Sequence, residues 1–339
     1  MGKTGLNLPR RRPAANAILI KTMARDNRID SLKGLLIILV ILGHVITTID
    51  NVNIVNHAVM GFIYIFHMPL FILISGYLTK PPQQQSSGSL FRSLGNLFVT
   101  LIIFHIINSI TRYLVTGISV WTTMTHFPYG ILWYLMCLIY WRLALYFTPR
   151  TLLEKPILHL GIALIVSLLS GLTHLGHLLA IQRALNFYFF FLLGYYYKQG
   201  VINQRWWKSN ALHFAFAIIL LPLIYWLFPR CGNFMNGADH YTLIDIPQKC
   251  LILTCSTALS ILLFNLMREH KFLCHFGKES LFYYVYHIII ITLARPLFQI
   301  HNLPHTFPFI LLYTLLVICI VYAMSRVKLF KWLMRPIRF

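Results

Sequence analysis

The sequence has few charged residues and very few acidic ones. Among its 339 residues, Asp and Glu account for 8 and Lys and Arg for 29, so 11% of the chain is charged and the formal net charge is +21. In a typical soluble domain about a quarter of the residues are charged. With 58% hydrophobic residues and a mean hydropathy of +0.69, the composition excludes an ordinary soluble domain. It predicts an all-α, polytopic membrane helical bundle.

The familiar motifs of soluble enzymes are also missing. The chain has no Walker A loop, no GxGxxG, no HExxH and no GxSxG. Its six Cys residues are scattered, without CxxC or the Cys/His spacing of a metal site, so we expect no metal and no bound cofactor. Cys231 and Cys250 flank one loop, and the sequence leaves open whether they form a disulfide in an oxidising compartment. No internal repeat is detectable.

Long apolar runs fill most of the chain and predict about ten transmembrane helices, each near the length that spans about 30 Å of hydrocarbon. Residues 1–28 are polar and basic, and residues 327–339 are also basic, so we expect two cytoplasmic tails around a membrane domain at 29–326. The predicted runs are 31–49, 58–78, 94–115, 129–147, 157–175, 183–198, 210–228, 249–266, 280–298 and 307–325.

The basic residues lie mostly on one side of these runs. If the N-terminus is cytoplasmic and the runs alternate, both termini are cytoplasmic and nearly all basic residues fall on the inner side, as the positive-inside rule requires. The high positive charge therefore indicates orientation in a membrane, in contact with membrane lipid, and not nucleic-acid binding. The five basic residues on the predicted outer side are Arg112, Arg183, Arg230, Lys249 and Arg295.

Two polar loops interrupt the apolar runs. Residues 79–93, TKPPQQQSSGSLFRS, contain paired prolines and are predicted to form a flexible inner linker. Residues 229–248 form the longest predicted outer segment and contain Gly, Asn and Asp. This loop is either a cover for a polar site or an ordinary connector, and the sequence does not separate the two.

The first apolar run contains the most informative pattern, RIDSLKGLLIILVILGH at 28–44. Lys33 and His44 are eleven residues apart, which is about three helical turns, so both side chains lie on one stripe about 16 Å apart. Asp30 precedes Lys33 by three residues and shares that stripe. Ionisable residues in a membrane helix usually face a bundle interior or a wet cavity and serve function. We therefore interpret this stripe as part of a functional site.

Two further His residues lie within apolar runs. His67 precedes Pro69 in the second run, and His287 follows Tyr286 in the ninth. Three intramembrane His residues indicate a buried polar cavity. For His67 and His287, a structural hydrogen bond between helices is an equally good interpretation. Trp133, near the predicted outer end of its run, is either part of an interfacial aromatic belt or a stacking platform for a sugar ring.

These residues resemble the acyltransferase 3 family over nearly the whole chain. Lys33-x10-His44 is similar to the family's R/K-x10-H signature, and FHMPLFILISGYL at 66–78 resembles its second conserved block. ILWYL at 131–135 and the spacing from Tyr283 to His287 resemble two later segments. Within the family the chain looks most like sugar O-acetyltransferases of the fucose 4-O-acetylase type. The chain departs from the family at a motif that is often Arg-x-x-Arg. Arg92 matches the first Arg, but Gly95 stands at the position of the second.

The resemblance implies an O-acetyltransferase of the bacterial cytoplasmic (inner) membrane. It would move an acetyl group from cytoplasmic acetyl-CoA, a co-substrate, to a hydroxyl of a cell-surface glycan or glycolipid such as lipopolysaccharide O-antigen or another polysaccharide. His44 acts as general base or forms an acyl-histidine, and both options stay open. The alternative function is a glycan exporter or a proton-coupled carrier. The predicted site comprises catalytic His44, His67 and His287, donor-binding Lys33, Arg92 and Asp30, and acceptor-binding Trp133 and Tyr286.

Overall fold

The computed structural model describes residues 25–48, 54–202, 207–219, 222, 237–301 and 306–334, and within these ranges it contains helices and no strands. Eight of the described helices are long and apolar enough to cross a membrane. The predicted fold class, an all-α polytopic membrane bundle, is therefore confirmed. The eight helices are α2 (Asn27–Thr48), α3 (Ile54–Leu78), α4 (Ser87–Thr116), α6 (Trp133–Phe147), α9 (Ile181–Lys198), α12 (Ile246–Leu266), α14 (Ser280–His301) and α15 (Phe307–Met324).

The other two predicted runs form shorter apolar helices. One is α8 (Pro156–Leu169), which continues into the 3-10 turn η3 (Ser170–Leu172). The other covers Asn210–Ile219, and the rest of that run lies outside the described residues, apart from Pro222. The remaining short helices are α5 (Val120–Met124), α7 (Arg150–Leu153), α13 (Lys271–Lys278) and α16 (Lys328–Leu333), with 3-10 turns η1 (Pro82–Gln84), η2 (Gly130–Leu132), η4 (Leu178–Ala180) and η5 (Leu243–Asp245).

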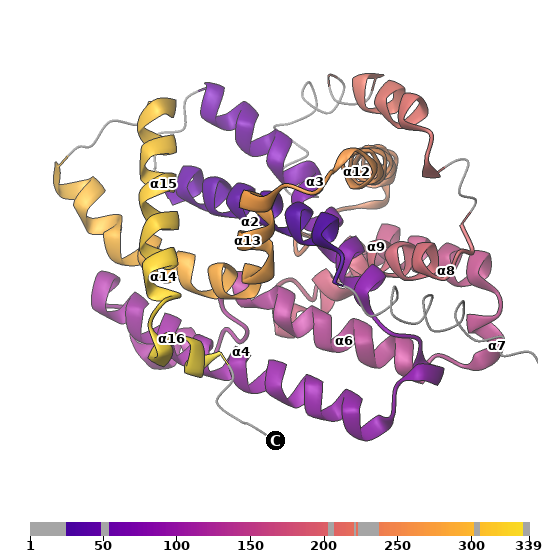
Figure 1. Cartoon of the computed structure of the whole chain (residues 1–339), viewed down its shortest axis with the longest axis horizontal. Helices are drawn as coiled ribbons and strands as arrows, with labels where there is room; N and C mark the ends of the chain where they lie inside the picture. Colours follow the sequence, from indigo (N-terminus) through magenta and orange to yellow (C-terminus); the bar gives the residue numbers. More distant parts are fainter. Residues whose placement is uncertain are drawn as a thin grey trace, which may run out of the picture.

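Helix α2 lies near the middle of the bundle, while α4 and α15 lie at its periphery (Figure 1). It packs against α3, α13, α14 and α15. Leu32, Leu36, Ile37, Ile41 and Val45 of α2 are all buried, and they point in several directions around the helix. A helix that is apolar all round is stable only when neighbours enclose it. The helix that carries Lys33 and His44 is therefore enclosed by protein.

Glycines allow two helix pairs to approach until their backbones touch. A Cβ on Gly34 of α2 would lie 1.9 Å from the Leu273 carbonyl oxygen of α13, and one on Gly76 of α3 would lie 1.8 Å from the Phe191 carbonyl oxygen of α9. Gly194 of α9 meets α3 in the same way. Small residues at such crossings are typical of membrane helix packing. They fix how α2 and α3, which bear Lys33, His44 and His67, sit among their neighbours.

Both ends of the described chain meet at the turn between α13 and α14. Arg25 donates to the Lys278 carbonyl oxygen at 3.5 Å, and Lys331 forms an ion pair with Glu279 at 2.8 Å. The residues nearest the two termini therefore lie at one end of the bundle, which we call the basic end. This arrangement agrees with the prediction that both termini lie on the same side of the membrane.

Candidate active site

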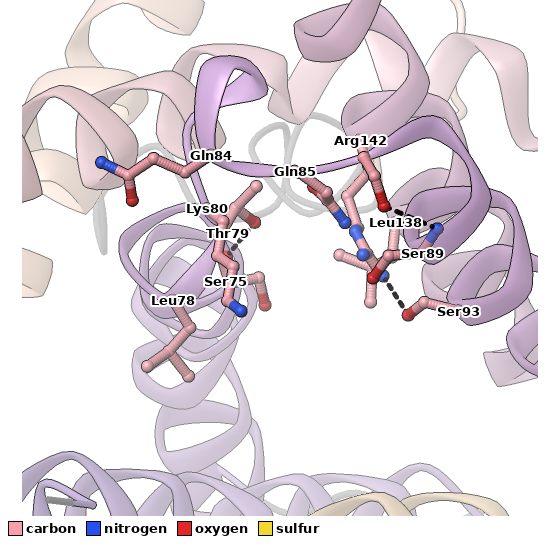
Figure 2. Close-up of a pocket in the computed structure, with 11 residues that line it drawn as sticks. Ser75, Leu78, Thr79, Lys80, Gln84, Gln85, Ser89, Ser93, Leu138 and Arg142 are labelled. Atoms are coloured by element: carbon pink, nitrogen blue, oxygen red, sulfur yellow. Dashed lines mark hydrogen bonds between the residues drawn. The ribbon is translucent and has the colours of Figure 1, made fainter. Parts of the chain in front are cut away.

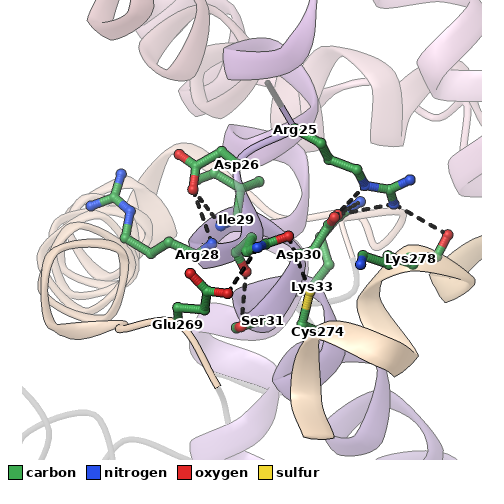
Figure 3. A network of polar contacts seen from close by, with 11 residues as sticks. Arg25, Asp26, Arg28, Ile29, Asp30, Ser31, Lys33, Glu269, Cys274 and Lys278 are labelled. Carbon is green, nitrogen blue, oxygen red and sulfur yellow. Dashed lines mark hydrogen bonds and ion pairs between the residues drawn. The ribbon is translucent and has the colours of Figure 1, made fainter. Parts of the chain in front are cut away.

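The basic end of α2 holds its cations through Asp30. The Asp30 side chain is buried, and it accepts from Lys33 Nζ at 2.7 Å and from the guanidinium of Arg25 (Figure 3). The hydrogen bond to Asp30 raises the pKa of Arg25 above its ordinary value. A carboxylate with two cations is a poor partner for a phosphate. Asp30 therefore pairs with Lys33, and Lys33 also borders a cavity in the bundle interior.

A narrow cavity of about 170 Å³ begins at Lys33 and extends into the bundle. Its walls come from α2, α3, α4, α6 and α14, and its inner part is bounded by Val40, Tyr134 and Tyr284. Ser75 and Tyr134 hydrogen-bond across it at 2.6 Å. Since the Ser75 hydroxyl donates to the Phe71 carbonyl oxygen at 2.9 Å, Tyr134 is the donor in this pair. The cavity is therefore mostly apolar, with a cation at its mouth and a hydroxyl pair on its wall.

A wider pocket of about 530 Å³ opens at the basic end and shares Ser75, Leu78 and Leu138 with the narrow cavity. Figure 2 shows Lys80 and Arg142 on either side of it, together with hydroxyl and amide side chains. Arg142 donates to Ser93 Oγ at 3.0 Å, which holds its guanidinium at the pocket wall. Ser86 caps the first turn of α4 there by accepting from the Ser89 backbone N–H. Cations beside a helix N-terminus are suited to phosphate groups.

The membrane histidines meet further along α2. The rings of His44 and His287 lie 5.3 Å apart, measured between centroids, and His287 is fully buried. Its Nδ1–H donates to the Tyr283 carbonyl oxygen at 2.9 Å, because a carbonyl can only accept. In the neutral ring the Nε2 atom then carries a lone pair, and no described residue hydrogen-bonds to it. His287 thus offers an acceptor atom close to His44.

His67 joins this pair from α3. Its Nδ1–H donates to the Ile63 carbonyl oxygen at 2.8 Å, and its ring packs edge-on against Tyr64 at 4.9 Å. Both His67 and His287 lie close enough to His44 to interact with it electrostatically. His44 itself is only partly buried, and its ring makes no hydrogen bond within the described part of the chain. Among the three rings, His44 is therefore the least buried.

A third cavity, of about 320 Å³, lies on the other side of this pair, toward the opposite end of the bundle. On α2 the narrow cavity reaches Val40 and the third cavity includes Thr47 and Thr48. On α14 the corresponding residues are Tyr284 and Ile288. His44 and His287 each fall between these positions, so the pair separates a cavity system at the basic end from a cavity at the opposite end.

Comparison with known proteins assigns the chain. A family model described as an acyltransferase domain, Acyl_transf_3, matches residues 26–326. The chain belongs to the acyltransferase 3 family. A stretch of 82 residues is also 42% identical to nodulation protein NolL of Sinorhizobium fredii (strain NBRC 101917 / NGR234). That match covers 23% of this chain and 22% of NolL, so the chain matches well under two thirds of its relative's length. No solved structure matches the chain.

The family and the fold together make the chain a multi-pass membrane protein of the acyltransferase 3 family. Three of the predicted site residues have other surroundings than the histidines. Arg92 of α4 is exposed and borders none of the three cavities described above. Tyr286 is buried and donates to the Phe330 carbonyl oxygen of α16 at 2.9 Å. Trp133 stacks on Phe187 and lies 5.1 Å from the guanidinium carbon of Arg183, so protein groups contact its ring.

The sequence alone did not single out Lys80 and Arg142 as site residues. The polar segment 79–93, predicted to be a flexible linker, instead forms η1 and the first turns of α4, and it lines the wide pocket. The Gln and Ser residues that follow Lys80 in this segment were the available signal for a polar pocket. In the other polar loop, residues 229–236 with Cys231 lie outside the described residues, residues 237–248 are described, and Cys250 carries a free thiol. No group of three or more His, Cys, Asp or Glu suited to a metal occurs within the described ranges.

Proposed function

We propose that this acyltransferase transfers an acetyl group from acetyl-CoA, bound at the basic end, to a hydroxyl of a glycan or glycolipid at the opposite end. The observation that carries the proposal is the position of His44 and His287 between two cavity systems. A donor and an acceptor that approach from opposite sides of a membrane must meet at one reactive group. His44 is the least buried of the three membrane histidines.

The basic-end cavities suit the shape and charge of the donor. Coenzyme A combines a phosphate-bearing head with a long, thin pantetheine arm. The wide pocket offers Lys80, Arg142 and the first turn of α4 for phosphate oxygens. The narrow cavity, lined by Lys33, Tyr134 and Tyr284 among others, then offers a mostly apolar space for the arm. In this arrangement the thioester lies at the inner end of the narrow cavity, near the histidines.

His44 supplies the proton transfer in the simplest mechanism. Its ring accepts the proton of the acceptor hydroxyl while the oxygen attacks the thioester carbon, the C–S bond breaks, and the leaving thiolate takes the proton. His287 Nε2, which carries a lone pair when Nδ1–H is donated to Tyr283, favours the protonated form of His44. In the second mechanism the acetyl group passes first to His44 and then to the acceptor oxygen, with the same products.

The test is transfer of label in membranes that contain the wild type or His44→Ala, given acetyl-CoA labelled in the acetyl group. We expect label in the extracted glycan or glycolipid with the wild type and none with the variant at equal protein level. His126→Ala is the matched control, because His126 is exposed and its ring donates to the Thr122 carbonyl oxygen in the α5 region. Full activity of His44→Ala would refute the assignment of the base.

The competing hypothesis is a glycan exporter or proton-coupled carrier, which would also use membrane histidines and cavities at both ends. The family assignment argues against it, because the family model describes an acyltransferase domain. The same membranes separate the two functions. A carrier moves unmodified glycan into vesicles without acetyl-CoA, whereas the proposed enzyme modifies it only when the donor is supplied.

A further inference from the structure

The cavity at the opposite end of the bundle contains two arginines. Arg112 of α4 and Arg295 of α14 both line the 320 Å³ space, together with Thr47, Asn108, Tyr129 and Thr292. None of the described lining residues is an Asp or a Glu. Guanidinium groups are expensive to place in a membrane helix and are usually retained for function. We call this space the arginine cavity.

Three helices direct their polar residues into the arginine cavity. Asn108 and Arg112 lie one turn apart on α4, and Ile288, Thr292 and Arg295 follow the same spacing on α14. Residues spaced in this way share one face of a helix. The two arginines therefore lie on the faces that α4 and α14 turn toward one common space, which α2 closes with Thr47 and Thr48.

Arg112 is held in place by neutral groups. Its Nη1 donates to Thr123 Oγ1 at 3.3 Å, and its guanidinium carbon lies 4.9 Å from the centre of the Tyr129 ring. A guanidinium has five N–H donors in a planar fork, and this contact with Thr123 uses one of them. Arg112 is thus oriented while most of its donors remain for a ligand. A planar fork suits the paired oxygens of a phosphate or carboxylate.

The arginines lie at a defined distance from the reactive histidines. Arg295 follows His287 by eight residues on α14, which corresponds to about 12 Å along the helix axis. Thr47 and Thr48 follow His44 by about one turn, and both donate to the His44 carbonyl oxygen. A molecule that spans the arginine cavity therefore reaches from the arginines to the level of His44.

We propose that the arginine cavity binds an anionic group of the acceptor, a phosphate or a carboxylate, about 12 Å from the hydroxyl that is acylated. The acceptor is then an anionic glycan or glycolipid. The position of the reacting hydroxyl rests on the proposed function, whereas binding of the anion does not. The same chemistry is offered by the headgroup of an anionic membrane lipid, so the experiment includes an arm for that source.

The first experiment measures the charge preference of the cavity without any acyl transfer. Thr292→Cys, with Val115→Cys as a second position, is reconstituted in phosphatidylcholine vesicles and alkylated with iodoacetyl reagents of similar size, one anionic and one cationic. Above the wild-type background, we expect the anionic reagent to react about tenfold faster. The double variant Arg112→Gln with Arg295→Gln should bring the ratio of the two reaction rates near one. Arg150→Gln should leave this ratio unchanged, because Arg150 is exposed on α7 and does not line the arginine cavity.

The second experiment identifies the anion. In the Cys variants that keep both Arg112 and Arg295, glucose 6-phosphate should slow alkylation by the anionic reagent. Glucose should not slow it. Protection by phosphatidylglycerol in the vesicle, without protection by glucose 6-phosphate, would mean that a lipid headgroup occupies the cavity, and the acceptor proposal would then be wrong. Equal rates for the two reagents, or no protection by either anion, would also overturn it.

A final arm connects the cavity to catalysis. In the labelled acetyl-CoA assay, Arg112→Gln with Arg295→Gln should raise the apparent KM for the acceptor about tenfold and leave the KM for acetyl-CoA unchanged. If the wild type transfers no label, the proposed function fails while the alkylation results stand. If label is transferred and the acceptor KM does not change, the anion site fails while the proposed function stands.

Discussion

The three membrane histidines differ in how their rings are held. His67 and His287 each donate Nδ1–H to the carbonyl oxygen four residues earlier in their own helix, which fixes the ring and places the lone pair on Nε2. His44 makes no such bond, and it is less buried than the other two. Two rings of fixed orientation therefore lie near one ring that is less buried and makes no such bond. On this difference we base the proposal that His44 transfers the proton and His287 supports it.

His287→Ala tests the supporting role. We expect kcat to fall about 10- to 100-fold with little change in the KM for acetyl-CoA, because the protonated form of His44 loses its stabilising partner. His159→Ala is the control, since His159 is equally buried but bonds to Tyr196 between α8 and α9. A similar loss of kcat in both variants, at equal folded protein, would show that His287 acts only through packing.

Separate substitution of Lys80 and Arg142 tests the proposal that the wide pocket binds the donor. Lys80→Ala and Arg142→Ala should each raise the KM for acetyl-CoA several-fold and change kcat little, because both side chains flank the wide pocket. Arg92→Ala is the informative comparison, since Arg92 is exposed on the same helix turn as Ser93 but borders none of the described cavities. A raised KM in Arg92→Ala alone would place the phosphates on the exposed face of α4, as the sequence predicted.

At the scale of helices, close backbone contact determines where the site residues lie. Gly76 of α3 and Gly194 of α9 pack against each other's helix, and Gly34 and Gly277 do the same for α2 and α13. The atoms nearest to an added Cβ at these glycines belong to backbone carbonyl groups, which cannot rotate away as a side chain does. Any added Cβ must therefore push the helices apart. Since α3 carries His67 and Ser75, that movement also widens the narrow cavity.

Gly76→Ala tests this helix contact. We expect a loss of about 1–3 kcal/mol in stability, seen as a lower Tm of the detergent-solubilised protein, together with lower activity. Gly95→Ala is the matched control, because Gly95 lies within α4 and a Cβ there meets nothing within 4 Å. That change should keep or slightly raise Tm, since Ala favours helix over Gly. Equal effects of the two substitutions would contradict the proposed contact.

At the scale of the whole molecule, charge determines orientation. Arg25 and Lys331 both bind the turn between α13 and α14, so the ends of the described chain share the basic end. The Lys80 and Arg142 pocket opens at that end, and the arginine cavity lies on the other side of the histidines. Under the positive-inside rule the first faces the cytoplasm, where acetyl-CoA is made, and the second faces outward.

Cysteine accessibility tests this orientation. Gln83→Cys in η1 and Thr125→Cys just after α5 are exposed positions at the two ends. With a membrane-impermeant maleimide, we expect Thr125→Cys to be labelled in intact cells and Gln83→Cys only after permeabilisation, each above the wild-type background. The reverse pattern would invert the molecule and place the wide pocket outside, which would remove its access to cytoplasmic acetyl-CoA.

The sequence alone determined the class of fold, the positions of the apolar helices and the stripe that joins Asp30, Lys33 and His44, because hydrophobic length and helical spacing are local properties. It also identified the His residues that meet in the structure. Only the tertiary structure decided which of them are close, which cations flank a pocket and where Tyr286 and Trp133 are engaged. Those facts depend on which helices pack together, and that packing joins residues that are distant in the chain.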